Sequence, residues 1–286
     1  MKGESALWQD YELIDSGRGE KYERYGPYTL VRPDPQAIWT PVLSDDEWVR
    51  ADAVYMREGQ TGTWHYRRPL PESWTMRFRE LRFKVRPTSF KHTGVFPEQA
   101  SNWLWIQEIL KDYGASDVLN LFAYTGGATL AAAAAGARVC HVDASKGAVR
   151  WARENQRLSR LEDKSVRWIQ DDVQAFVSRE IRRGKKYHGI IMDPPPYGRG
   201  VSGEIWKIET HLSGLVARCS DLLSDNPAFF LINSYATGYS HFSFRNLLAE
   251  QVTPLGGTLS SGDMLLPHSR SNRYLPCGVY ARWSGR

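Results

Sequence analysis

The stretch that decides the fold is DVLNLFAYTGGATLAAAAAGARVCHVDAS, residues 117–145. It opens with a mostly apolar run at residues 118–122, which predicts a buried strand, and a turn of mostly small residues follows at 123–127. An alanine-rich helix comes next, and a second strand at residues 139–142 ends on Asp143. A strand, a glycine turn, a helix and a second strand that closes on an acid are typical of the front half of a nucleotide-binding βαβ unit.

The chemistry of the turn narrows the class of ligand. Gly126 and Gly127 allow a backbone to approach a ligand where a Cβ would clash, and the following helix presents free N–H groups. Asp143 lies 16 residues beyond Gly127, near the spacing at which an acid accepts hydrogen bonds from ribose hydroxyls. Because the turn lacks the G-x-G-x-x-G pattern of dinucleotide sites, we expect a ligand with a ribose and no phosphate, such as S-adenosylmethionine (SAM). The alternative interpretation is an ordinary α/β crossover whose acid is only solvated.

The bulk composition bounds the class of protein. The chain has 286 residues, enough for one large α/β domain and a smaller module, and its 42% hydrophobic and 24% charged residues are normal for a soluble globular protein. No apolar run approaches the roughly 18 residues that span a bilayer, and residues 1–5 lack the apolar segment of a secretory signal. Cys140, Cys219 and Cys277 are too few and too scattered for a disulfide framework or a metal cluster. We therefore expect a cytoplasmic protein with no metal and no membrane partner, and the net charge of +5 favours an anionic partner only weakly.

Residues 1–95 predict a small module that is mostly β-structure, ahead of an α/β domain over residues 96–286. Within the module, residues 74–86 alternate between two kinds of side chain. The apolar ones are Trp74, Met76, Phe78, Leu81, Phe83 and Val85, and the basic ones are Arg77, Arg79, Arg82, Lys84 and Arg86. The pattern fits a hairpin with one apolar and one basic face. The basic face is either a solvated outer surface or a surface that contacts nucleic-acid phosphates.

A second motif, Asp193-Pro194-Pro195-Pro196-Tyr197, follows a predicted strand at residues 187–192, and a helix over residues 204–223 is expected after it. The prolines stiffen the loop and have no N–H, so its carbonyl groups are expected to be free acceptors. With the Asp193 carboxylate and the Tyr197 ring, they would form a slot for a flat, amino-bearing ring. The alternative is a rigid turn with a capping aspartate.

A pair of acids follows the predicted third strand. Residues 166–170 are followed by Asp171 and Asp172, just before a helix that begins at Val173. One acid is enough to cap this helix, which leaves the other for the amino group of a ligand.

Five stretches of the chain resemble those of class I SAM-dependent methyltransferases, in the branch with the large-subunit ribosomal RNA methyltransferases that act on cytosine C5 or guanine N7. They are, in order, residues 92–99 (HTGVFPEQ), 119–127 (LNLFAYTGG), 142–145 (VDAS), 170–173 (QDDV) and 193–197 (DPPPY). The resemblance implies that residues 96–286 form a Rossmann-like methyltransferase domain, with a seven-stranded sheet whose last strand is antiparallel. The module at residues 1–95 would then serve substrate or RNA binding.

The resemblance also implies roles for individual residues. Gln99 would close over SAM, the turn at residues 124–127 would wrap its methionine moiety, and Asp143 would bind its ribose. Asp171 and Asp172 would lie at the adenine amino group. The implied cofactor-binding residues are Gln99, Phe122, Tyr124, Thr125, Gly126, Gly127, Asp143, Ala144, Ser145, Asp171, Asp172 and Asp193, and the implied catalytic residues are Asp193, Pro194, Pro195 and Tyr197.

The atom that accepts the methyl group depends on whether a cysteine is placed to add to the base. Relatives that act on C5 are expected to carry a cysteine at the end of the fifth strand, where this sequence has Ser234 and Tyr235. We therefore predict a nitrogen acceptor in RNA, on an unpaired base that stacks on Tyr197. The alternatives are a SAM-dependent methyltransferase that acts on a protein or a small molecule, a nicotinamide oxidoreductase, and a non-catalytic RNA-binding module. The missing third glycine disfavours the oxidoreductase, and the intact cofactor turn disfavours the non-catalytic module.

Overall fold

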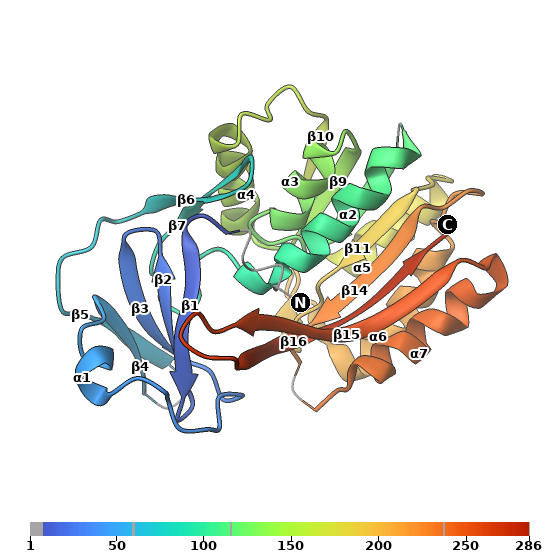
Figure 1. Cartoon of the computed structure of the whole chain (residues 1–286). Coiled ribbons are helices and arrows are strands. Elements are labelled where there is room, and N and C mark those ends of the chain that lie inside the picture. Colours follow the sequence, from blue (N-terminus) through green and yellow to red (C-terminus); the bar gives the residue numbers. More distant parts are fainter. Residues whose placement is uncertain (1–7, 59–60, 115, 237, 286) are drawn as a thin grey trace. The chain divides into compact units, whose positions relative to one another are not determined.

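The computed structural model, drawn in Figure 1, describes residues 8–58, 61–114, 116–236 and 238–285. The chain divides into two compact units, which are residues 1–101 with 265–277 and residues 102–264 with 278–286. The domain boundary expected between residues 95 and 96 stays a prediction. Residues 1–5, on which the expected lack of a secretory signal rests, lie outside the described residues.

The first unit is rich in β-structure, as the sequence predicts. Five strands form a sheet in the order β1-β2-β3-β4-β5, and two more form the hairpin β6–β7. Neighbouring strands of the sheet are antiparallel except for β3 and β4, which are parallel. The elements are β1 (Tyr11–Gly17), β2 (Glu20–Tyr25), β3 (Tyr28–Pro33), α1 (Asp45–Trp48), β4 (Ala53–Glu58), β5 (Thr61–Tyr66), β6 (Trp74–Phe78), β7 (Leu81–Val85) and the 3-10 turn η2 (Pro97–Gln99).

The hairpin β6–β7 has the two faces that its alternating sequence predicts. Its buried face is formed by Met76, Phe78, Leu81, Phe83 and Val85. On the opposite face, Arg77 pairs across the strands with Arg82, and Thr75 pairs with Lys84. The basic side chains therefore share one surface of the first unit.

The second unit is built on a seven-stranded sheet in the order β10-β9-β8-β11-β14-β16-β15. The strands from β10 to β14 run parallel, and β16 runs antiparallel to β14. This is the Rossmann-like sheet with a reversed last strand that was predicted. The strands are β8 (Asp117–Leu121), β9 (Arg138–Asp143), β10 (Val166–Gln170), β11 (Gly189–Met192), β14 (Phe229–Ser234), β15 (Thr258–Pro267) and β16 (Tyr274–Ser284).

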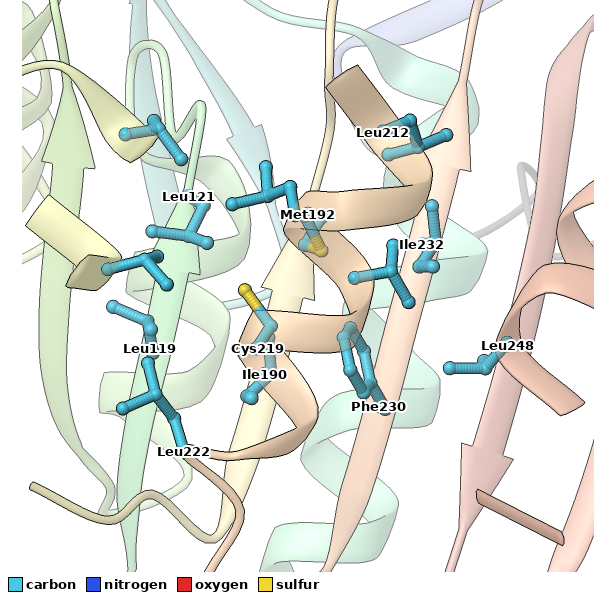
Figure 2. Packing of buried hydrophobic residues seen from close by; sticks show 14 of the residues in the cluster. Leu119, Leu121, Ile190, Met192, Leu212, Cys219, Leu222, Phe230, Ile232 and Leu248 are labelled. Carbon is cyan, nitrogen blue, oxygen red and sulfur yellow. The ribbon is translucent and has the colours of Figure 1, made fainter. Parts of the chain in front are cut away.

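Helices cover both faces of this sheet, because alternate residues of each buried strand point to opposite sides. The face that carries Leu119, Leu121 and Ile190 packs against α5, α6 and α7, and Figure 2 shows part of this cluster. The face that carries Val118 and Ile191 packs against α2 and α3. The helices are α2 (Ala100–Tyr113), α3 (Gly127–Ala134), α4 (Lys146–Leu158), α5 (Val173–Arg182), α6 (Ile208–Ser220) and α7 (His241–Val252), followed by the 3-10 turn η3 (Thr253–Leu255).

The helix predicted over residues 204–223 is wrong at its N-terminal end. There, β13 (Ile205–Lys207) pairs with β12 (Tyr197–Arg199) in a short antiparallel hairpin, and α6 begins only after it. Burial alternates along β13, since Trp206 is buried between two exposed residues, and this period of two is that of a strand. Gly203, with a φ of 94°, turns the chain between the two strands.

Candidate active site

The predicted site residues of the second unit gather at one edge of its sheet. β8, β9, β10 and β11 are parallel, and their carboxyl ends lead into Phe122, Asp143, Asp171 and Asp193 respectively. The chain passes from β8 to β9 on one side and later returns to β11 on the other, so the strand order reverses beside β8. In open α/β sheets, ligands bind at the carboxyl edge next to such a reversal.

The loop after β8 has a backbone conformation that is unusual for its residues. Phe122 and Tyr124 have φ values of 55° and 47°, in the left-handed region that non-glycine residues rarely adopt. Such positions cost on the order of 1–3 kcal/mol each and persist where their surroundings enforce them. Here the Tyr124 N–H donates to Asp143 Oδ2 at 2.8 Å, and the Asn155 side chain donates to the Thr125 carbonyl at 2.9 Å. These bonds attach the loop to the end of β9 and to α4.

The two glycines of this turn also serve packing. A Cβ built on Gly127 would overlap the Trp103 ring of α2, and one built on Gly126 would lie 3.0 Å from the Ala152 Cβ of α4. Gly126 also has a φ of 87°, which a glycine adopts without strain. The glycines therefore let α2 and α4 pack close to the turn, and this role is separate from any access that they give to a ligand.

Asp143 is the centre of the hydrogen bonds at this edge. Its Oδ2 accepts from the Tyr124 N–H, and its Oδ1 accepts from the Ser145 N–H at 2.8 Å. Ser145 in turn caps α4, because its Oγ accepts from the Ala148 N–H. Burial raises the pKa of Asp143 above its ordinary value, and the two backbone hydrogen bonds oppose this shift. Each carboxylate oxygen has two lone pairs, so each can accept from one further donor.

The two acids after β10 are both engaged. Asp172 caps α5, because its Oδ1 accepts from the Ala175 N–H at 2.8 Å. Asp171 forms an ion pair with Arg179 of the same helix, and its N–H donates to the Asp143 carbonyl at 3.1 Å. The predicted cap is confirmed. Arg179, the partner of the second acid, is a residue that the sequence analysis missed.

The acid-proline loop is less open than the sequence suggests. The Pro195 carbonyl accepts from the Trp206 Nε1–H at 2.7 Å, and the Pro196 carbonyl accepts from the Ile208 N–H at 3.0 Å. The prediction that the carbonyls of this loop are free is therefore wrong for these two, because the segment after the loop folds back onto it. At the start of the loop, the Asp193 N–H donates to the Leu121 carbonyl at 3.3 Å, which holds Asp193 beside the end of β8.

Trp206 is a second residue at this edge that the sequence analysis missed. Its ring packs on Phe122, with 4.9 Å between the ring centroids, so the hairpin β12–β13 is attached to the loop after β8. Tyr197, on the other strand of the hairpin, is 52% exposed. Ile205, Trp206 and Lys207 are two apolar residues and a cation, so the sequence does not show the alternation of burial that marks this strand.

Gln99 belongs to the first unit and is described within it. It is the last residue of η2 and is buried. Its predicted approach to SAM stays a prediction.

The cysteines lie in three separate elements, β9, α6 and β16. Burial raises the pKa of the Cys140 thiol to about 11 and that of Cys219 to about 12, and it also raises the pKa of Cys277.

Over the described parts of the chain, no group of three or more His, Cys, Asp or Glu residues could hold a metal ion. In the same parts, no helix is both long and apolar enough to cross a membrane.

The strand order, the reversed last strand and the acids along the carboxyl edge define a class I methyltransferase fold. Comparison with known families gives the same class, because a family model described as "S-adenosylmethionine-dependent methyltransferase" matches residues 45–239, well over half of the chain. The chain belongs to this family, is an enzyme, and uses SAM as its cofactor.

Individual relatives agree with this assignment. The SAM-dependent methyltransferase from Agrobacterium tumefaciens is 40% identical, with a TM-score of 0.93 over 98% of this chain and 91% of that one. SMU.776, crystallised with S-adenosylhomocysteine, is 18% identical with a TM-score of 0.71 over 97% of this chain and 76% of that one, which is a likeness of fold. Among curated relatives, the ribosomal RNA large subunit methyltransferase K/L of Ectopseudomonas mendocina is 37% identical over 51% of this chain. The chain spans only 19% of that relative's length.

Proposed function

We propose that the protein transfers a methyl group from SAM to a nitrogen atom of an unpaired nucleobase in ribosomal RNA, in the cytoplasm. The observation that carries RNA as the substrate class is the basic face of the hairpin β6–β7. The printed name of the Ectopseudomonas mendocina relative supports the same class of substrate.

The basic face keeps like charges close together. Arg77 lies directly opposite Arg82, at a spacing where two cations repel each other. Asp10 compensates Arg77, since it accepts from both its backbone N–H and its guanidinium, and Glu72 lies 3.9 Å from Arg86. These are exposed ion pairs, which contribute little in water. A surface with clustered cations suits a polyanion, whose condensed counterions are released on binding.

The residues at the carboxyl edge of the sheet fit SAM. Asp143 is a partly buried carboxylate with two acceptor positions beyond its backbone bonds, and these match the two hydroxyl groups of a ribose. Gly126, the N-cap of α3, has no side chain to occupy the first N–H groups of the helix. These N–H groups would donate to the carboxylate of the methionine moiety. Phe122, Ala144 and the acids after β10 would line the space for the adenosine.

At the acceptor, the residues of the chain would align the base with the methyl group of SAM. SAM, when bound, supplies a methyl group that its sulfonium has already activated. Asp193 would accept a hydrogen bond from an N–H of the acceptor base, which orients the nitrogen lone pair and offsets the positive charge that develops there. Pro194 and Pro195 keep the loop stiff, and the exposed Tyr197 ring would stack on the base. The base has to leave its helix to reach this loop.

The placement of the cysteines supports a nitrogen atom, and not cytosine C5, as the acceptor of the methyl group. Addition to C6 of cytosine needs a thiolate, and burial raises the pKa of Cys140 and Cys219 far above neutral pH. Ser234 stands at the end of β14, and its Oγ accepts from the Ala236 N–H at 3.1 Å. A serine in this position offers no thiolate to the base.

Transfer of labelled methyl tests the proposal. SAM with a tritiated methyl group is incubated with total RNA from a strain that lacks this gene, using the wild type, Asp193→Ala and the surface control Asp163→Ala. We expect label in RNA with the wild type and the control, and about a hundredfold less with Asp193→Ala. Thermal unfolding followed by circular dichroism checks that each variant is folded.

Digestion of the labelled RNA then identifies the methylated atom by mass spectrometry. A methyl group on nitrogen is the expected result, and 5-methylcytosine would contradict the nitrogen acceptor. A wild type that binds SAM but places no label in RNA would move the acceptor to a protein or a small molecule, and the face of β6–β7 would then be a solvated surface.

A further inference from the structure

The hairpin β12–β13, which the sequence did not predict, has two faces of different character. Gly198 and Trp206 are opposed on its inner face, and Trp206 is buried. The outer face carries four exposed side chains, which are Tyr197, Arg199, Ile205 and Lys207.

The inner face attaches the hairpin to the site. Trp206 packs on Phe122 at the end of β8 and donates to the Pro195 carbonyl. Beyond β12, a Cβ built on Gly200 would lie 2.9 Å from Asp172 Oδ2, so the chain there passes directly over the N-cap of α5. The hairpin therefore lies along the carboxyl edge of the sheet, between the end of β8 and the acids after β10.

The outer face alternates between cations and apolar groups. Tyr197 lies opposite Lys207, and Arg199 lies opposite Ile205, so the two cations are diagonal neighbours. Diagonal side chains are about 7–8 Å apart, which avoids the repulsion of directly opposed like charges. Tyr197 and Ile205 are each 52% exposed, and Val201 in the connecting turn is 50% exposed. The Tyr197 ring and the Ile205 side chain are therefore both accessible to a ligand on this face.

We infer that this outer face binds a single-stranded segment of the RNA, with the Tyr197 ring on the acceptor base, Ile205 against the next base, and Arg199 and Lys207 on the phosphates. The inference rests on the proposed function, in that it takes RNA as the substrate. Only a strand with unstacked bases offers base faces and phosphates together, and these match the alternation of apolar and cationic groups. A duplex hides its base faces, and an acidic peptide would use the cations alone. The hairpin thus selects unpaired RNA.

The test compares two double variants in the full-length protein. R199A/K207A removes both cations of the outer face. R182A/K185A removes two exposed cations near the C-terminal end of α5, at the opposite end of that helix from its N-cap. The probes are a fluorescein-labelled single-stranded RNA of mixed sequence and the same strand in a duplex. For R199A/K207A, we expect weaker binding of the single strand and a salt dependence of log K whose slope is smaller by about 1.4, as for two lost phosphate contacts. The control should match the wild type.

The ring is tested separately. Tyr197→Ala should weaken binding of the single strand roughly 5- to 150-fold, since one base–aromatic stack contributes about 1–3 kcal/mol, and Tyr197→Phe should restore it. In all variants the affinity for SAM should stay that of the wild type, because the outer side chains face away from Phe122.

Each outcome decides the inference. It is overturned if R199A/K207A shows the affinity and salt slope of R182A/K185A, if the wild type prefers the duplex, or if SAM affinity falls in parallel with RNA affinity. In these cases label would still enter RNA in the transfer assay, so the proposed function would stand without the hairpin's role. A wild type that methylates no RNA would overturn both.

Discussion

The backbone N–H of Tyr124 donates to Asp143 Oδ2 at 2.8 Å, and this bond attaches the loop after β8 to the acid that ends β9. Tyr124 is held at a φ of 47°, so the bond offsets part of the strain in the loop. The same carboxylate oxygen keeps one lone pair for a ligand. Asp143 therefore supports the loop and is also available to a ribose, which makes it the most informative single position in the site.

Asp143→Asn should weaken SAM binding. The amide keeps one oxygen acceptor, but its NH₂ group meets the N–H of Tyr124 or of Ser145, and the charged acceptor for a ribose hydroxyl is lost. A hydrogen bond to a charged group contributes about 1.5–3 kcal/mol, so we expect the Kd for SAM to rise roughly 10- to 150-fold. Calorimetry measures the Kd, with Asp163→Asn on the surface as the control. An unchanged Kd in Asp143→Asn would rule out the ribose contact.

Gly127→Ala should destabilise the protein through packing. The new Cβ would overlap the Trp103 ring, and overpacking of this kind lowers the free energy of unfolding by about 1–3 kcal/mol. Gly214→Ala in α6 is the matched control, since nothing lies within 4 Å of its Cβ and alanine is favoured within a helix by about 0.5–1 kcal/mol. Denaturant unfolding measures both. If Trp103 is the cause, the cost of Gly127→Ala should shrink in a Trp103→Phe background.

The sequence predicts β8, β9 and β11 because each is a mostly apolar run, and β9 and β11 lead to an acid. Leu119 and Leu121 face one helical layer while Val118 faces the other, so both kinds of position had to be apolar. The acids Asp143 and Asp193 then mark the carboxyl ends, and parallel pairing brings them to one edge. This much follows from local pattern and from the rules of α/β sheets.

The hairpin β12–β13 was not predictable in the same way. Its β13 strand has three residues, and its conformation depends on the tertiary contact of Trp206 with Phe122 and on the bond to the Pro195 carbonyl. Neither contact has a sequence signature. The ion pair of Asp171 with Arg179 is similar, because an arginine within a helix is usually only solvated.

Serine in place of each cysteine should leave turnover intact. Cys140, Cys219 and Cys277 are thiols whose pKa is raised by burial, so none is a thiolate at neutral pH. The variants at Cys140 and Cys219 bury a hydroxyl, which can lower the free energy of unfolding by about 1–3 kcal/mol. The measurement is kcat at a temperature where thermal unfolding shows the variant to be native. If any one variant lost turnover while its stability stayed unchanged, this would indicate that its cysteine acts as a covalent catalyst.

His141 should make stability depend on pH. It is fully buried in β9, with Nδ1 2.9 Å from Thr129 Oγ1, which also accepts from the Asn120 side chain. The tautomer of His141 decides which of Thr129 Oγ1 and His141 Nδ1 donates, and Nε2 has no hydrogen-bond partner in the part of the chain that the structure describes. Burial, with a smaller effect from Arg153, lowers the pKa of His141 to about 3.

The direction in which pH changes the free energy of unfolding follows from the difference in the pKa of His141 between the folded and unfolded states. The unfolded chain protonates His141 near its ordinary pKa of about 6.5, while the folded chain resists protonation down to a far lower pH. The unfolded state therefore binds more protons in this window, and the free energy of unfolding falls as the pH drops below about 6.5, by up to about 1.4 kcal/mol per pH unit. His141→Gln, which stays neutral, should lose less stability than the wild type over the same range. His65→Gln, at an exposed position, is the control and should follow the wild type. Parallel curves for His141→Gln and the wild type would mean that the buried imidazole is already protonated or accessible in the native state.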